Sequence, residues 1–269
     1  MRYGCCVNML ARDEYRVGFD WIEILPGLGF DYVDLPIAQM MDMDEASFAE
    51  KIVRPLRSSG IPCVCVNNLF PASICLTGPD ADFGAALDYI RRALDRAARI
   101  GAVKAVFGSS GARNVPFGFP HAEAARQLCE VLQRIAEPAR EYGVTYVIEP
   151  LNKLESNILN GIAESQALCE AANDPQVKML ADTYHMALSG ETPKDVLRTR
   201  GSLRHVHLAR PLGRGMPTPG DGEDYASFFD ALRTIGYDED ISIEAYAPSD
   251  PEKELKTALD YLKAIEKDK

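Results

Sequence analysis

Short apolar runs recur along the whole chain, separated by longer stretches in which apolar and polar residues repeat with a helical period. Each run holds five to eight residues, the length of a buried strand rather than of a helix. The runs lie at residues 2–9, 31–35, 62–67, 103–108, 144–149, 178–182, 203–208 and 240–246. This pattern predicts eight strands, each followed by a helix.

The stretches between the runs carry signals for the start and the end of helices. Asp44 is a plausible cap for the helix that follows it, and Gly101 and Gly143 are typical of the glycine that ends a helix. A cap residue followed by proline at the first helical position indicates two further starts. Helices are predicted over 44–59, 81–100, 121–142 and 223–235, with the further starts at Thr192-Pro193 and Asp250-Pro251.

Strand and helix alternate with a strand-to-strand spacing of about 25 to 42 residues. Such units are joined by right-handed crossovers and form a parallel sheet. Eight of them predict a single-domain (β/α)₈ barrel, a TIM barrel, over residues 1–269. An open doubly wound sheet is the alternative, but no glycine-rich phosphate turn follows the first strand. In a barrel of this kind the active site lies at the C-terminal ends of the strands.

Composition and charge narrow the classes of partner. The chain has 269 residues, 46% apolar and 26% charged, and a formal net charge of −11 with Lys and Arg spread over helix faces. A nucleic acid or an anionic membrane would require a concentrated basic surface, so we expect neither as a partner. The seven cysteines are an odd number in a large chain, which argues against a disulfide framework. With no apolar stretch of membrane-spanning length and no signal-peptide pattern, a cytoplasmic protein is expected.

Four metal-binding side chains stand at the ends of the last four predicted strands. They are Glu149, Asp182, His207 and Glu244. Parallel neighbouring strands lie about 4.8 Å apart, so inward-pointing side chains at their ends can meet around one cation. Three oxygen donors and one imidazole suit Mn²⁺, Mg²⁺ or Co²⁺ better than a structural zinc ion, which favours thiolates.

Each of these residues also has a plain structural interpretation. Glu149 and Glu244 could be carboxylates paired with a neighbouring strand, and Asp182 could cap the turn that follows it. His205 shares a face with His207 but lies one layer deeper, so we interpret it as a core histidine that supports the site. His185 is expected in the loop beyond Asp182, where it would either reach over the metal or be exposed.

Four segments of the chain are similar in sequence to segments of a known protein family. EPLNKLESNILN (149–160), ADTYHM (181–186), HVHL (205–208) and IEAY (243–246) are similar to segments of the xylose isomerase-like barrels, and within them to the ketose 3-epimerases of the tagatose and psicose type. The resemblance implies that Glu149 and Glu244 are both catalytic and metal-binding and that Asp182 and His207 complete the metal site. It also implies that Glu155 and His185 contact the substrate.

This chain departs from the family pattern at one position beyond the metal histidine. The epimerases have an arginine six residues beyond the metal histidine, where this chain has Gly213, with Arg210 and Arg214 nearby. We expect Arg214 to contact the substrate, and the loop 210–222 is longer than the usual one. The family implies one divalent ion, most of all Mn²⁺, a small sugar substrate, and a homodimer or homotetramer.

The chemistry implied is proton transfer next to a carbonyl through an enediolate, with Glu149 and Glu244 acting on opposite faces. An inosose-type dehydratase and a hydroxypyruvate isomerase are alternatives on the same barrel. An apurinic endonuclease is a remote alternative, since that family uses a histidine-rich zinc cluster and a basic face, whereas this chain has four histidines and a charge of −11. A sugar-binding protein without activity is a further alternative.

Overall fold

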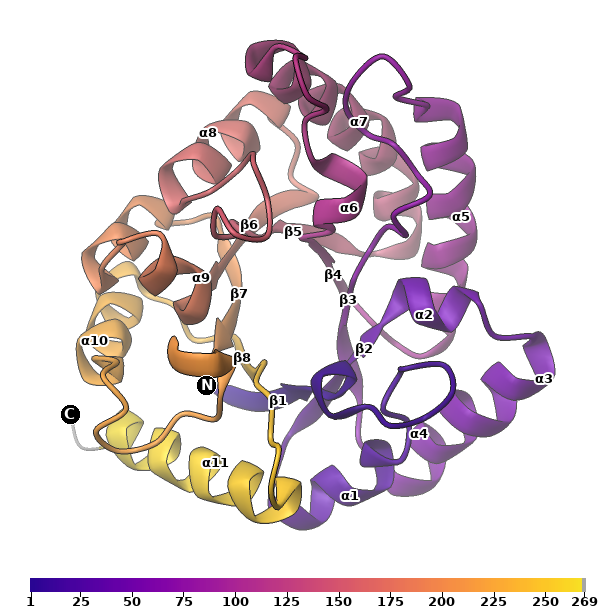
Figure 1. Ribbon diagram of the computed structural model, residues 1–269. Helices are drawn as coiled ribbons and strands as arrows, with labels where there is room; N and C mark the ends of the chain where they lie inside the picture. Colours follow the sequence, from indigo (N-terminus) through magenta and orange to yellow (C-terminus); the bar gives the residue numbers. More distant parts are fainter. Residues whose placement is uncertain (268–269) are drawn as a thin grey trace.

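Eight parallel strands close into a barrel in the order of the sequence. The structure is a computed structural model that describes residues 1–267. In Figure 1 the strands ring the centre and the helices form the outer layer, with the N-terminus and α11 on the same side. The strands are β1 (Arg2–Cys6), β2 (Tyr32–Pro36), β3 (Cys63–Asn67), β4 (Lys104–Phe107), β5 (Thr145–Ile148), β6 (Val177–Asp182), β7 (Leu203–Leu208) and β8 (Asp240–Ile243). The predicted (β/α)₈ barrel is therefore confirmed.

Two predicted strands extend too far at their C-terminal ends. The run 2–9 is a strand only as far as Cys6, because Val7–Leu10 forms a 3₁₀ helix, and the run 240–246 is a strand only as far as Ile243. In both places the chain leaves the barrel before its buried apolar residues end. Val7, Leu10 and Ala245 are buried although they lie beyond the strand ends, so hydrophobicity alone does not mark the strand end.

The helices predicted to end at Gly143 and Gly236 do end there. The α-helices are α1 (Trp21–Leu28), α2 (Ile37–Met41), α3 (Glu45–Phe48), α4 (Arg54–Ser59), α5 (Phe83–Arg99), α6 (Ser110–Arg113), α7 (His121–Tyr142), α8 (Ile162–Ala172), α9 (Thr183–Leu188), α10 (Tyr225–Ile235) and α11 (Pro251–Lys267). Gly143 and Gly236 end α7 and α10 in the left-handed conformation, with φ of 67° and 75°.

Two helical predictions need correction. The region 44–59 begins with the Asp44 cap but divides into α3, a π-helical turn at Ala49–Val53 and α4. Thr192 caps a 3₁₀ helix over Pro193–Thr199 and not an α-helix. Within residues 1–267, no helix is both long and apolar enough to cross a membrane.

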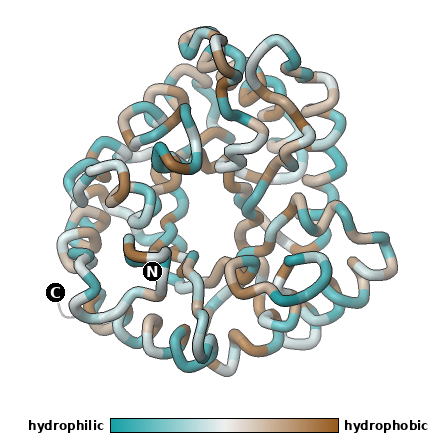
Figure 2. Tube along the Cα trace, viewed as in Figure 1, coloured by the Kyte–Doolittle hydropathy of each residue, from teal (hydrophilic) through white to brown (hydrophobic). Residues whose placement is uncertain are grey.

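The core has an outer and an inner part. Outward-facing strand residues such as Ile148 and Ile243 pack against the helices, whose hydrophobic and hydrophilic positions alternate along their length in Figure 2. The barrel interior holds a smaller apolar cluster of Cys65, Val106, Val147 and Leu180. Because side chains alternate along a strand, Val147 and Leu180 lie one layer below Glu149 and Asp182. They form the floor of the site on that side.

Candidate active site

The four side chains expected to bind metal gather at the mouth of the barrel. Their donor atoms all lie within 4.8 Å of one another. His207 Nδ1 lies 3.0 Å from Glu149 Oε1, 3.0 Å from Glu244 Oε2 and 4.0 Å from Asp182 Oδ2. The most exposed member, Glu244, has only 7% of its surface accessible. Three buried carboxylates beside one imidazole are a donor set suited to a hard divalent cation.

The two carboxylate oxygens of Asp182 have different partners. Oδ1 accepts hydrogen bonds from the backbone N–H groups of Tyr184 at 2.7 Å and His185 at 3.3 Å, which caps α9. Oδ2 faces His207. The capping interpretation and the metal-site interpretation of Asp182 are thus compatible, and the cap holds the carboxylate rigidly.

Gly108 and Arg113 hold Glu149 in place, and neither was predicted from the sequence. A side-chain carbon at Gly108 would lie 2.1 Å from Glu149 Oε2, so only glycine leaves room for this carboxylate. The fully buried Arg113 donates to the backbone oxygens of Phe107 at 2.7 Å and Glu149 at 2.8 Å. Arg113 therefore ties the end of β4 to the end of β5, and burial lowers its pKa to about 10.

Arg214 lies at the centre of the carboxylates. Its guanidinium donates to Asp182 Oδ2 at 3.4 Å and to Glu244 Oε2, and it lies 3.8 Å from Glu155 Oε2. The same group stacks over the Tyr184 ring, 4.8 Å from its centroid. Burial opposes the charge of Arg214, but Glu244 and Asp182 outweigh it and raise its pKa above the usual range. The predicted contact residues Glu155 and Arg214 thus lie beside the cluster.

Burial and neighbouring charges shift the pKa values of the carboxyl groups in opposite directions. Burial raises the pKa of Asp182 to about 8, because it outweighs the opposing effect of Arg214. Burial also acts on Glu244, but there Arg214 and His207 outweigh it and hold the pKa well below its usual range. For His207, burial is outweighed by Cys6, Glu244 and Glu149, so its pKa is raised. Such divergent pKa values in one small cluster are typical of a functional site.

His185 is in α9 and not in a loop, which corrects the expectation. It is 1% exposed, and its Nδ1 accepts from the backbone N–H of Asn152 at 3.2 Å and faces the Asn152 side-chain amide at 2.9 Å. An acceptor at Nδ1 places the ring proton on Nε2, which makes no hydrogen bond within residues 1–267. His185 lines the cavity above the cluster, so this N–H is free to donate to a ligand there.

We expect His185 to stay neutral in the metal-free protein from pH 9 down to pH 5. Burial lowers its pKa from 6.5 to about 3. The unfolded chain binds this proton near pH 6.5, so His185 makes stability fall as the pH drops from about 6.5 towards 3. NMR titration of the histidine ring nitrogens tests this. A His185 midpoint above pH 5 would contradict it.

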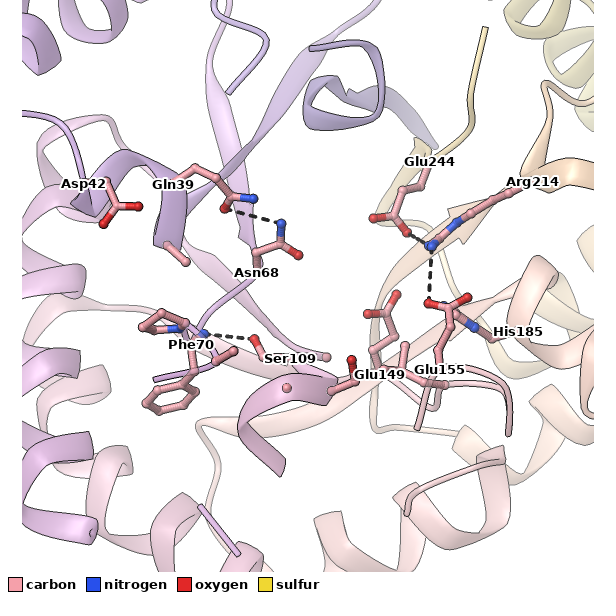
Figure 3. Close-up of a pocket in the computed structure, with 17 residues that line it drawn as sticks. Gln39, Asp42, Asn68, Phe70, Ser109, Glu149, Glu155, His185, Arg214 and Glu244 are labelled. Atoms are coloured by element: carbon pink, nitrogen blue, oxygen red, sulfur yellow. Dashed lines mark hydrogen bonds and ion pairs between the residues drawn. The ribbon is translucent and has the colours of Figure 1, made fainter. Parts of the chain in front are cut away.

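The cavity above the cluster has a second polar wall, contributed by the N-terminal half of the chain. In Figure 3 Gln39, Asp42 and Asn68 face the cavity opposite Glu244 and Arg214, with Ser109 between the two sides. The Asn68 amide donates to Gln39 Oε1 at 3.4 Å. None of these residues was predicted from the sequence to line the site. A polar residue just after β3, as Asn68 is, was the signal available for finding them.

A family model described as xylose isomerase-like TIM barrel matches residues 16–265. The chain is 28% identical over 233 residues to a ketose 3-epimerase of Arthrobacter globiformis, covering 82% of this chain and 75% of that protein. It is 27% identical over 249 residues to a probable ketose 3-epimerase of Synechocystis sp., covering 90% of this chain and 79% of that one. A crystal structure of D-psicose 3-epimerase with D-tagatose, from Clostridium cellulolyticum H10, matches with a TM-score of 0.88 at 19% identity, covering 99% of both chains.

The solved structure supports the fold. The two sequence relatives are by name ketose 3-epimerases, which belong to the isomerase class, and this confirms the expected class of enzyme. The match to the family model spans nearly the whole barrel and confirms the resemblance drawn from the four segments. This chain belongs to the xylose isomerase-like TIM barrel family.

Proposed function

We propose that the protein is a divalent-metal-dependent sugar epimerase that inverts the carbon next to the carbonyl of a ketose. One observation carries the proposal. Glu149 and Glu244 approach His207 Nδ1 at 3.0 Å each from β5 and β8, and in Figure 3 their carboxylates face each other across a gap. Two bases on opposite sides of one reacting carbon are what inversion by proton transfer requires.

Glu149, Asp182, His207 and Glu244 would hold the cation, which when bound supplies Lewis-acid polarisation of the sugar oxygens. One glutamate then takes the proton from the carbon next to the carbonyl, which gives an enediolate. The other glutamate enters this step as the protonated acid, donates its proton to the opposite face and inverts the centre, so the two glutamates exchange protonation states in each turnover. Removal and return by the same glutamate would regenerate the substrate.

The residues around the cluster would orient the sugar. The Nε2–H of His185 and the guanidinium of Arg214 are donors for substrate oxygens, and Glu155 is an acceptor for a hydroxyl. Because its pKa is about 3, His185 is neutral at pH 7 and holds no imidazolium proton to give to a leaving group. This favours epimerisation over dehydration, which needs an acid beside the leaving hydroxyl.

The charge of the cavity favours an unphosphorylated sugar. Arg214 is the only cationic side chain among the described residues that line it, against the four carboxylates Asp42, Glu149, Glu155 and Glu244. A phosphate group would be repelled by Asp42 and Glu155 with no second cation to bind it. Mn²⁺ is the proposed ion, since oxygen-rich donors with one imidazole suit it. A homodimer or homotetramer stays a prediction from the family.

We expect the change Gln39→Ala to raise the KM for the sugar about 5- to 50-fold with a smaller change in kcat. The Gln39 and Asn68 amides face the far end of the cavity, where they would bind hydroxyls distant from the reacting carbon. Removing one partner leaves a desolvated hydroxyl of the sugar unpaired, which costs about 1–2.3 kcal/mol, the equivalent of that change in KM. Gln133→Ala, on α7 outside the cavity, is the matched control, and steady-state kinetics of both variants are compared. An unchanged KM for Gln39→Ala would contradict this role.

Solvent deuterium incorporation tests the proposed function. The protein is stripped with EDTA, loaded with Mn²⁺ for catalysis, and incubated in D₂O with a panel of ketoses and aldoses. NMR is recorded after the ion is removed. We expect metal-dependent labelling at C3 of a ketose together with the inverted sugar. Labelling at C1 or C2 would indicate an aldose–ketose isomerase, and an unsaturated product would indicate a dehydratase. Nicking of abasic DNA would indicate an endonuclease.

A further inference from the structure

We propose that Cys6 is a positioning residue for His207: its sulfur accepts the Nε2–H of the imidazole, which directs Nδ1 at the carboxylates. This inference rests on the proposed metal site. Neither the family segments nor the sequence analysis assigned a role to Cys6, which is the last residue of β1.

The two nitrogens of His207 face different partners. Nδ1 has Glu149 and Glu244 at 3.0 Å each, whereas Nε2 has the Cys6 sulfur at 3.6 Å. Both Cys6 and His207 are 0% exposed, so water does not compete for Nε2. A cation held by the carboxylates would therefore meet Nδ1, and the thiol would lie on the far side of the ring.

The hydrogen bonds around Cys6 fix the direction in which its S–H points. The thiol donates to Asp34 Oδ2 at 3.7 Å. Ser242 also donates to this oxygen, and His205 Nε2 lies 3.0 Å from it. Because the S–H is directed at Asp34, the sulfur presents lone pairs to His207. The nitrogen facing the sulfur then donates to it, so Nδ1 is the nitrogen that faces the carboxylates and would bind a cation held there.

Metal sites commonly contain a hydrogen bond that orients the histidine ligand, and here a thiol supplies it. A histidine that binds metal usually donates its second N–H to a carboxylate or a carbonyl, which fixes the tautomer and the ring orientation. Here Asp34 is the carboxylate, and Cys6 connects it to His207. His205 and Ser242 hold Asp34 in place from β7 and β8. The supporting role expected for His205 thus acts through Asp34.

Cys5 provides a matched control on the same strand. It is 1% exposed, about as buried as Cys6, but belongs to the outer apolar cluster that packs against the helices. Cys5→Ala removes an equally buried sulfur without removing a partner of His207. Cys6→Ser keeps a group that can accept from Nε2 and donate to Asp34.

The experiment is calorimetric titration of Mn²⁺ into the EDTA-stripped full chain and its variants. We expect Cys6→Ala to weaken binding about 10- to 100-fold, the usual effect of losing such a support. Cys6→Ser should recover most of the affinity, and Cys5→Ala should bind as the wild type does. In long-range ¹H–¹⁵N spectra of the Mg²⁺-loaded wild type, we expect the His207 proton on Nε2.

The outcomes separate this inference from the proposed function. Equal affinity of Cys6→Ala and wild type, an equal loss in Cys5→Ala, or a His207 proton on Nδ1 would overturn the role of Cys6. If the wild type bound two ions and Cys6→Ala bound one, the positioning role of Cys6 would also be overturned, since the thiol would then be a metal ligand. A wild type that binds no divalent ion would overturn the metal site itself. The spectra need no variant and decide the tautomer even if Cys6→Ala fails to fold.

Discussion

Turnover is expected to fall at least about 10³-fold when either Glu149 or Glu244 is replaced by glutamine. Each change removes a general base, and such a base commonly contributes 10²- to 10⁴-fold. Each also replaces a carboxylate of the cluster by a neutral amide, which weakens the cation site. The two losses act on the same step, so the double variant should be little worse than either single one. Steady-state rates on the sugar identified by deuterium labelling measure the effect.

Glu141→Gln is the matched control, because Glu141 is an exposed carboxylate on α7, away from the cavity. It should retain wild-type rates. Circular dichroism and thermal unfolding show whether the inactive variants still fold. The two single variants should also differ in deuterium labelling, since each keeps the base for one face of the sugar. Near-normal turnover in Glu149→Gln or Glu244→Gln would refute the two-base mechanism.

Chelation by EDTA is expected to abolish turnover and to lower the unfolding temperature, and Mn²⁺ should restore both. A ligand at 100 times its Kd stabilises a protein by about 2.7 kcal/mol, which for a chain of this size corresponds to roughly 5–10 °C. The cation would replace Arg214 as the counter-charge of Asp182 and Glu244, the two carboxylates that the guanidinium contacts. The net gain is smaller than the full attraction between the ion and its ligands, because these contacts are given up.

Differential scanning calorimetry and activity assays are run on the same samples before and after metal addition. Monovalent salt at equal ionic strength is the control for general screening of the buried carboxylates. Glu141→Gln should respond to Mn²⁺ as the wild type does, whereas Glu244→Gln should lose much of the thermal shift. Full activity after exhaustive chelation would contradict metal dependence and would also remove the basis for the proposed role of Cys6.

Periodicity and end signals along the chain predicted the barrel correctly, because strand and helix formation depend on local burial patterns. The predicted run 144–149 differs from β5 by one residue at each end, and the helix 121–142 begins and ends as predicted. Errors arose where local pattern and tertiary packing diverge. Val7–Leu10 continues the buried pattern of β1 at Val7 and Leu10 but forms a 3₁₀ helix. His185 follows its strand directly and is in a short helix, which Asp182 caps.

The order of the strands and helices could be predicted from the sequence. So could the four strand-end side chains Glu149, Asp182, His207 and Glu244, since parallel strands present their C-terminal ends together. What surrounds these side chains could be found only in the folded barrel. Gly108, Arg113, Asp34 and Cys6 lie far from the cluster in sequence, and their roles follow from contacts across the closed barrel. A local pattern reports whether a residue is buried, but barrel closure selects its neighbours, and those neighbours set hydrogen bonds and pKa values.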